Sequence, residues 1–247
     1  MRPMLKLLAD NRRSGFFRAE KNDAADTLYI YDMIVATDLD AEIWGGVSAE
    51  SFVKTIKTTT APVLHLRINS PGGDVFAARA MEQALREYSG KVIAHIDGYA
   101  ASAASFLAMS ADEIVIAKGG FFMIHKAWTI AVGNADDLLS VASLLEKLDG
   151  TLVQTYAYRT GKAPALIADW MAEETWFSAQ ESVDNGFADK IAEDAPKNKA
   201  NWDMSAYAHA PESVAPEAAP VAATTEEKAL PDIDALRRKL RIVEKAA

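Results

Sequence analysis

The sequence predicts an α/β fold in which parallel strands are joined by helical crossovers. Short apolar runs of strand length alternate along the chain with segments that carry apolar residues at helical spacing. That alternation is typical of sheets whose parallel strands are connected by helices. The chain has 247 residues, half of them hydrophobic, and a mean hydropathy of -0.04. It is therefore long and apolar enough for one large domain with an appendage.

Five apolar runs are expected to form the strands. Each is rich in β-branched or aromatic residues and is bounded by turn-forming residues. A further short extended segment is expected at residues 176–177. The five runs are 28–34, 63–68, 91–97, 113–117 and 121–124.

Capping residues mark the expected helix boundaries. Ser48 is expected to cap a helix that reaches about residue 58, and Pro164 to open one that ends near residue 172. Ser178 and Glu181 have the spacing of a capping box for a short helix. Two more helices are expected at residues 75–88 and 101–109.

The longest predicted helix covers residues 135–160. Asn134 is its expected cap, with Asp137 at the third helical position, and Gly161 is expected to end it. The helix is too long for a simple crossover, so its apolar stripe is expected to meet either the core or another subunit. The stripe consists of Leu138, Val141, Leu145, Leu148 and Leu152.

Composition divides the chain into four parts. The first residues are polar and irregular, whereas the region after about residue 196 is rich in Pro, Ala, Glu and Thr and lacks periodicity. Near the C-terminus, apolar residues recur on one helical face among basic ones. The expected parts are an arm at 1–27, the main domain at 28–195, a disordered linker at 196–230 and an amphipathic helix at 231–247.

Charge and composition limit the classes of partner and site. The net charge of -9 and the pI of about 5.0 argue against nucleic acid or an anionic membrane as the main partner. The absence of cysteine excludes disulfides, a cysteine nucleophile and thiolate metal sites. No apolar run reaches the roughly 20 residues that span a bilayer, and the N-terminal apolar patch is too short for a signal peptide. We therefore expect a cytoplasmic protein, and no cofactor or metal is expected.

A serine stands between a predicted strand and a predicted helix, in the sequence Gly-Tyr-Ala-Ala-Ser-Ala-Ala-Ser at 98–105. Such a corner can leave the Ser102 hydroxyl free as a nucleophile and the N–H of Ala103 free to stabilise an oxyanion. The same small residues would also let a helix pack closely on a strand. The pattern alone does not separate these two interpretations.

A serine nucleophile needs a base and further oxyanion donors. Gly72 and Gly73 form a turn that can bring backbone N–H groups close to a ligand, although an ordinary strand-to-helix turn has the same sequence.

The base is chosen among four histidines. His65 and His95 lie within apolar strands and His209 lies in the tail. By elimination, His125 at the end of the strand 121–124 is the candidate base.

Four short motifs occur in order along the chain. They are Ile-Asn-Ser-Pro-Gly-Gly at 68–73, Gly-Tyr-Ala-Ala-Ser at 98–102, Met-Ile-His at 123–125 and Phe-Ser-Ala-Gln-Glu-Ser-Val-Asp-Asn-Gly at 177–186. Their order and spacing resemble the Clp protease proteolytic subunit (ClpP) family, over roughly residues 28–192. The resemblance implies a ClpP/crotonase-like fold of repeated ββα units with a protruding long helix. It also implies ring oligomers, such as a heptameric ring or double ring, with the helix 135–160 at the position of the inter-ring handle.

The resemblance implies a serine endopeptidase whose nucleophile is Ser102 and whose base is His125. The oxyanion donors would be the backbone N–H groups of Gly73 and Ala103. The position of the family's third triad residue, an aspartate, holds Glu174 in this chain.

A glutamate can orient a histidine and stabilise its imidazolium as an aspartate does. Glu173 is a close rival for this role and Asp169 a weaker one.

Two departures from ClpP resemble the ClpP-related head maturation proteases of tailed phages and prophages. The family's N-terminal processing and pore-loop segment has no match in residues 1–27, and the tail after about residue 195 is foreign to ClpP. The sequence Glu-Thr-Trp-Phe at 174–177 is also similar to that group. This resemblance implies a capsid or scaffold protein as substrate, in the host cytoplasm or the prohead, without an ATPase. The tail would be a scaffold-like, targeting or self-cleavage segment.

Several alternatives stay open. A housekeeping-type ClpP subunit would work with an AAA+ ATPase. A serine–lysine peptidase of the same superfamily would use Lys118 or Lys126, which His125 and the absence of a membrane anchor disfavour. A crotonase-type acyl-CoA enzyme would share the fold and the paired N–H groups but would not need this serine and histidine. A non-catalytic scaffold protein is the alternative outside enzymes.

Overall fold

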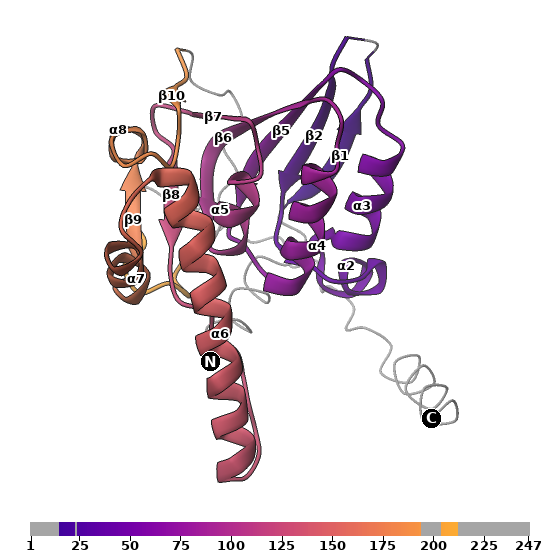
Figure 1. The fold of residues 1–247 in the computed structure, drawn as a ribbon. Helices are drawn as coiled ribbons and strands as arrows, with labels where there is room; N and C mark the ends of the chain where they lie inside the picture. Colours follow the sequence, from indigo (N-terminus) through magenta and orange to yellow (C-terminus); the bar gives the residue numbers. More distant parts are fainter. Residues whose placement is uncertain (1–14, 23, 194–203, 212–247) are drawn as a thin grey trace, which may run out of the picture. The chain divides into compact units, whose positions relative to one another are not determined.

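The computed structural model describes residues 15–22, 24–193 and 204–211, and these form a twisted sheet covered by helices on one face (Figure 1). Six strands follow each other across the sheet in the order β1-β2-β5-β6-β7-β10, and two more, β8 and β9, continue from β6. The strands are β1 (Phe16–Glu20), β2 (Asp26–Tyr31), β5 (Val63–Ser70), β6 (Lys91–Ala101), β7 (Glu113–Ile116), β8 (Phe121–Ile124), β9 (Thr175–Ser178) and β10 (Lys190–Ile191). A separate parallel pair consists of β3 (Ile34–Val35) and β4 (Val47–Ser48).

The central strands are parallel, as the alternation of strands and helices predicts. Their register aligns one buried apolar row across the sheet, made of Leu28, Leu66, Ala94 and Ile114. Because strand side chains alternate between faces, the neighbouring row lies on the other face and includes Arg67 and His95. One face of the sheet is therefore apolar and the other carries polar groups.

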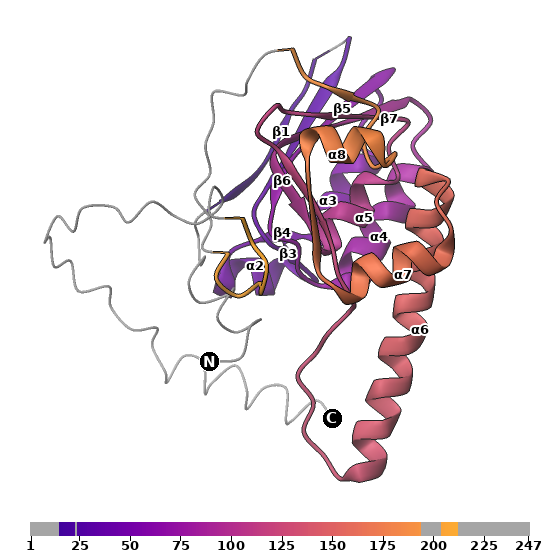
Figure 2. The same cartoon turned by 90° about the vertical axis from the view of Figure 1, so that its left-hand side faces the viewer.

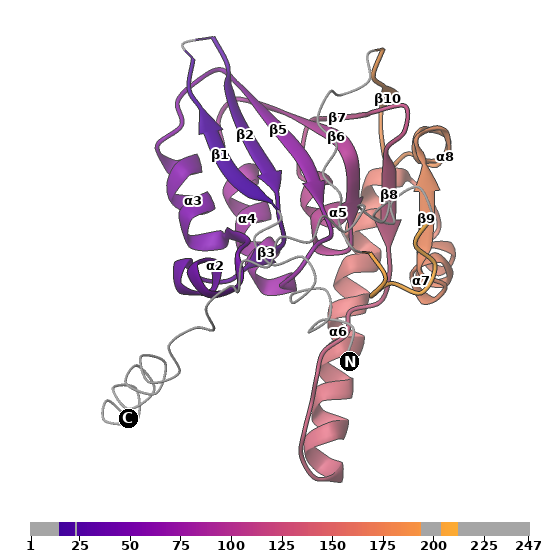
Figure 3. The ribbon, with the colours of Figure 1, turned by 180° about the vertical axis from the view of Figure 1, so that it is seen from behind.

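The helices cover the apolar face. Helices α3 (Ala49–Lys57), α4 (Val75–Arg86) and α5 (Ala103–Ala108) lie against it in Figure 1, and the view from behind shows the strands in front (Figure 3). Ser48 caps α3 as predicted, since its side chain accepts the N–H of Ser51. The remaining short helices are α2 (Asp38–Trp44), α7 (Pro164–Ala172) and α8 (Ala179–Asp184). The mixed α/β fold class predicted from the sequence is confirmed.

Helix α6 (Ala135–Thr160) has the predicted bounds and caps. Asn134 and Asp137 form its capping box, and Gly161 ends it in the left-handed conformation with φ of 68°. Its buried residues, Leu152 and Tyr156, both lie in the C-terminal half. The N-terminal half projects away from the sheet (Figure 2) and leaves large apolar side chains exposed, namely Leu138, Leu139 and Leu144. No helix in the described part of the chain is both long and apolar enough to cross a membrane.

Several local expectations were wrong or incomplete. The arm expected at 1–27 contains β1, which pairs antiparallel with β2, and the first residues of β2. β1 is mostly exposed and is held by backbone pairing and ring contacts of Phe16, so it has no apolar alternation to detect. Helix α2 was missed because none of its residues is buried.

Strand β6 runs four residues beyond its predicted end. It changes partner at Gly98, pairing with β7 through Ile96 and with β8 from Tyr99 onward. A Cβ at Gly98 would lie 2.6 Å from Asn69 Oδ1, so the glycine is required by close packing rather than by a turn.

Part of the expected linker is structured. Residues 204–211 lie within the range 196–230, yet Met204 and Tyr207 are buried in a cluster with β6 and β8 residues. The amphipathic helix expected at 231–247 and residues 1–14 lie outside the described residues.

Candidate active site

Ser102 stands at the corner between β6 and α5 in a backbone conformation that L-residues rarely adopt. Its φ is 53° and its ψ is -122°. Such a conformation costs roughly 1–3 kcal/mol and persists only where the surroundings hold it. The Ser102 N–H donates to Met123 O at 3.0 Å, and its carbonyl accepts from the Ser105 N–H at 2.9 Å and from Ser105 Oγ at 2.6 Å. Hydrogen bonds on both sides thus hold the strained corner in place.

The turn at Gly72 and Gly73 packs directly on this corner. A Cβ at Gly72 would lie 2.8 Å from Ser102 Cβ and 2.9 Å from Ala103 N. Gly73 has φ of 147°, and a Cβ there would lie 2.1 Å from Ile34 O. Both positions therefore need glycine.

The two predicted oxyanion donors are kept out of the surrounding backbone pairing. Around Gly73 the bridging bonds run from Ile34 N–H to Gly72 O and from Asp74 N–H to Ile34 O, so the Gly73 N–H takes no part in them. Ala103 is the first residue of α5, where a backbone N–H has no acceptor within the helix.

His125 lies directly after β8, beside the end of β6. The parallel register pairs Ala101 with Met123, so the next residues of the two strands approach each other. His125 Nε2 lies 2.7 Å from Ser102 Oγ, a normal hydrogen-bond distance. The two residues are 23 positions apart in the sequence, and they meet because both follow the carboxyl ends of neighbouring parallel strands.

The surroundings keep His125 neutral at neutral pH. Burial lowers the pKa of His125 from 6.5 to about 4, and the negative charge of Glu174 acts in the opposite direction. A neutral imidazole has a free lone pair and can accept a proton.

Of the three acidic candidates, only Glu174 acts electrostatically on His125. Among the described residues, however, no hydrogen bond joins it to His125. Its Oε1 instead accepts from the His209 N–H at 2.7 Å and from Trp176 Nε1 at 3.4 Å. Glu174 also has a positive φ, of 50°. Glu173 and Asp169 are exposed.

The other strand histidines lie elsewhere. His65 Nδ1 lies 2.9 Å from His95 Nε2 on the polar face of the sheet, where burial lowers the pKa of His95 to about 4.

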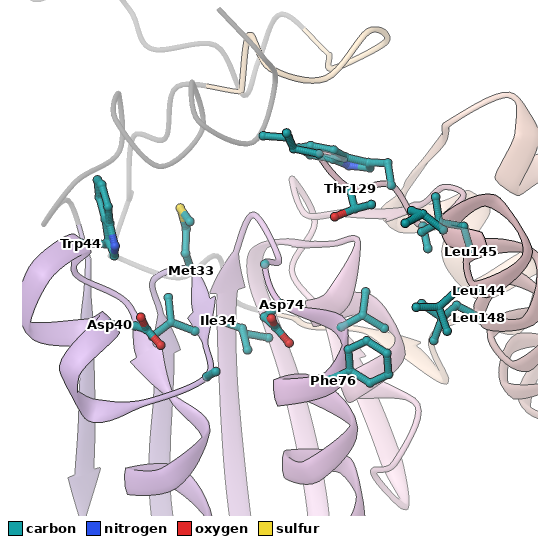
Figure 4. A pocket seen from close by; sticks show the side chains of 18 residues that line it. Met33, Ile34, Asp40, Trp44, Asp74, Phe76, Thr129, Leu144, Leu145 and Leu148 are labelled. Atoms are coloured by element: carbon teal, nitrogen blue, oxygen red, sulfur yellow. The ribbon is translucent and has the colours of Figure 1, made fainter. Parts of the chain in front are cut away.

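An apolar groove of about 450 Å³ begins beside Gly73 (Figure 4). Met33 and Ile34 line one side, Leu145 and Leu148 of α6 line the other, and Phe76 lies near Leu148. An apolar side chain of a bound peptide fits the character of this groove. The described residues include no group of three or more His, Asp or Glu side chains placed to hold a metal ion.

Comparison with known proteins gives the family. The model of the Clp protease family matches residues 31–195. The chain belongs to the Clp protease family. Membership in the Clp protease family supports a serine-type peptidase.

The curated relatives have about 30% sequence identity, and each alignment covers only part of this chain and part of the relative. The ATP-dependent Clp protease proteolytic subunit 2 of Tropheryma whipplei (strain Twist) is 30% identical over 130 residues, covering 52% of this chain and 72% of that protein. The ATP-dependent Clp protease proteolytic subunit 1 of Protochlamydia amoebophila (strain UWE25) is 32% identical over 134 residues, covering 53% and 65%.

A solved structure, a ClpP1 mutant from Listeria monocytogenes, superposes with a TM-score of 0.58 at 20% identity. It covers 68% of this chain and 91% of that chain. At this identity the likeness shows the ClpP fold alone.

Sequence reasoning missed one residue that this Clp protease family chain brings to the site. The Tyr207 hydroxyl donates to Pro71 O at 2.5 Å, across 136 residues of sequence, and its ring meets His125 edge-on with centroids 5.5 Å apart. His209, set aside as a tail residue, reaches Glu174 as described above. The available signal was the close spacing of the large apolar residues Trp202, Met204 and Tyr207 in a tail that is mostly Ala, Pro and polar residues.

Proposed function

We propose that this chain is a serine endopeptidase that hydrolyses peptide bonds through an acyl-enzyme. The observation that carries the proposal is the 2.7 Å contact between His125 Nε2 and Ser102 Oγ at a strained corner beside the glycine turn. Family membership supports the same reaction class.

The geometry supports the following reaction. His125 Nε2 takes the proton of Ser102 Oγ as the oxygen attacks the scissile carbonyl. The N–H groups of Gly73 and Ala103 receive the oxyanion of the tetrahedral intermediate. His125 then gives its proton to the leaving amine, which departs as the acyl-enzyme forms. A water molecule, deprotonated by His125, attacks the ester and releases the acid and the free serine.

Glu174 is proposed as the third member of this site. Its negative charge favours the protonated form of His125, which the reaction forms transiently. This carboxylate is half-buried, whereas Glu173 and Asp169 are exposed. In the described structure its Oε1 is engaged by His209.

The substrate and assembly are proposed from the sequence departures. The tail after residue 195 and the Glu-Thr-Trp-Phe segment support a role in phage capsid or scaffold maturation, without an ATPase. The names of the curated relatives describe ATP-dependent proteolytic subunits, which supports the housekeeping alternative. A ring assembly is proposed because the projecting half of α6 exposes leucines that a second copy would cover.

The test is labelling by a fluorophosphonate probe, followed by peptide mapping. We expect label on Ser102, loss of label in Ser102→Ala and in His125→Asn, and unchanged label in Ser89→Ala, an exposed serine. A crotonase-type enzyme would not label, and a non-catalytic scaffold would neither label nor hydrolyse a peptide. Cleavage of an unfolded polypeptide by the purified chain alone supports the ATPase-independent role, and an absolute requirement for an AAA+ ATPase refutes it.

A further inference from the structure

A short piece of the tail, residues 204–211, lies on the candidate active site. It runs beside β8 and β9, as the view from behind shows (Figure 3). Met204 is 1% exposed and Tyr207 is 8% exposed, although the residues between them are not buried. The segment is therefore anchored by two apolar side chains, which pack with Met33, Tyr99 and Met123.

The Tyr207 side chain occupies the space over the reacting groups. Its ring meets the imidazole of His125 at 5.5 Å and the indole of Trp176 at 5.9 Å between centroids, both edge-on. Its hydroxyl donates to Pro71 O, in the turn that carries the proposed oxyanion donor Gly73. Burial raises the pKa of the Tyr207 phenol, and the neighbouring Ser102 side chain acts to lower it. One side chain thus contacts the proposed base and the glycine turn and lies next to the proposed nucleophile.

The segment also binds the acidic side of the site. The His209 N–H donates to Glu174 Oε1 at 2.7 Å, and His209 Nδ1 lies 2.8 Å from Glu173 O. His209 therefore contacts the turn before β9, two residues along the chain from Tyr207, which contacts His125.

We propose that residues 204–211 are an intramolecular inhibitor, which covers Ser102 and His125 with Tyr207 and must leave before a peptide can bind. The inference rests on the proposed peptidase function. The segment presents a phenol to the nucleophile. A phenol has no carbonyl carbon for the serine to attack, so Tyr207 blocks the site as a stable plug. Because the inhibitor belongs to the same chain, its effective concentration is fixed by the tether and does not fall on dilution.

The test compares fluorophosphonate labelling rates of full-length proteins. The rate is proportional to the fraction of molecules with an open site. Tyr207→Ala removes the ring and the hydroxyl contact with Pro71, and we expect its labelling rate at Ser102 to rise by about tenfold or more, which is one decade in the opening equilibrium. Tyr207→Phe keeps the ring and should give a smaller rise. Tyr158→Ala, at a tyrosine that is 89% exposed on α6, is the matched control and should label at the wild-type rate.

A second variant guards against an indirect effect of one substitution. Met204→Asp would place a charge in the buried cluster and should release the segment, raising the labelling rate as Tyr207→Ala does. A synthetic peptide with the sequence of residues 204–211 should slow labelling of the Tyr207→Ala protein at millimolar concentration, and the same peptide with alanine for tyrosine should not. Labelling of Tyr207→Ala and Met204→Asp at or below the wild-type rate overturns the proposal.

A measurement that needs no catalysis separates the two hypotheses. Burial holds the pKa of His125 at about 4, so removal of Tyr207 should raise it toward 6.5 in an NMR titration of the full-length protein. An unchanged titration shows that Tyr207 does not cover His125 and overturns the inference. If the titration shifts but neither protein labels at Ser102, the peptidase function fails and the inhibitory role fails with it. If the wild-type protein is labelled at Ser102 and Tyr207→Ala is labelled no faster, only the inhibitory role is refuted.

Discussion

Replacing Ser102 by glycine and by alanine separates the backbone strain at the corner from the loss of the hydroxyl. Both variants lose the contact with His125, so their difference reports the backbone alone. At φ of 53° and ψ of -122°, a side chain costs roughly 1–3 kcal/mol, whereas glycine adopts this conformation freely. Against this, glycine loses about 0.5–1 kcal/mol more than alanine through chain entropy on folding. We therefore expect the free energy of unfolding of Ser102→Gly to exceed that of Ser102→Ala by up to about 2.5 kcal/mol.

Urea denaturation followed by circular dichroism measures this difference. In a domain of this size, 1 kcal/mol corresponds to about 2–4 °C in Tm, so a thermal scan gives a second reading. Ser89 is the control, because it is exposed and has no positive φ. There glycine should be less stable than alanine by about 0.4–1 kcal/mol. If Ser102→Gly is no more stable than Ser102→Ala, the strain argument is refuted.

Three other perturbations have defined outcomes. The pKa of His125 is about 4 in the folded chain against 6.5 for a free histidine, so between these values only the unfolded state binds the proton and the fold loses stability as the pH is lowered. His125→Asn should therefore lose about 2–3 kcal/mol less of its free energy of unfolding than wild type between pH 7 and pH 4.5, measured by urea denaturation. Gly73→Ala should reduce the labelling rate at Ser102 at least roughly 100-fold, because its Cβ would lie 2.1 Å from Ile34 O and displace a proposed oxyanion donor. Tyr156→Phe should destabilise the fold by about 1–2 kcal/mol in urea, because its buried hydroxyl bonds Ser105 Oγ at 2.7 Å.

Each of these outcomes has a control or a contradicting result. The buried Asp32, whose pKa burial raises to about 6, changes stability with pH in the opposite direction, but equally in wild type and His125→Asn. Parallel stability curves of these two proteins would contradict the assigned pKa. Gly150→Ala, where a Cβ meets nothing within 4 Å inside α6, should stabilise the helix by about 0.5–1 kcal/mol and leave labelling unchanged. For Tyr156→Phe, wild-type stability would show that the Ser105 bond contributes nothing.

Local signals explain which elements were predictable. The caps at Ser48, Asn134 and Ser178 set helix starts through residues no more than three positions away, and the structure has all three. Elements without a buried face, such as β1 and α2, carry no such pattern, because their stability comes from strand pairing or capping rather than from burial.

The site was predictable where it follows from strand ends and not where it depends on distant contacts. Ser102 and His125 come together because β6 and β8 are parallel neighbours, an arrangement that the strand and helix order favours. The positive φ angles of Ser102 and Glu174 depend on the surrounding packing, and neither serine nor glutamate predicts a positive φ from the sequence. The Tyr207 contact with Pro71 joins segments 136 residues apart, and composition identified only a linker there.

Ser102 is held at three atoms by separate parts of the chain. Its N–H is fixed by Met123, its carbonyl by Ser105 and its hydroxyl by His125. Two of these three anchors do not involve the imidazole. The serine backbone should therefore keep its place when the histidine side chain is cut away, and the vacated space has the shape of the lost ring. We therefore expect a His125→Gly protein to bind added imidazole in place of the lost side chain, so that the proposed proton acceptor of this site could be supplied from solution.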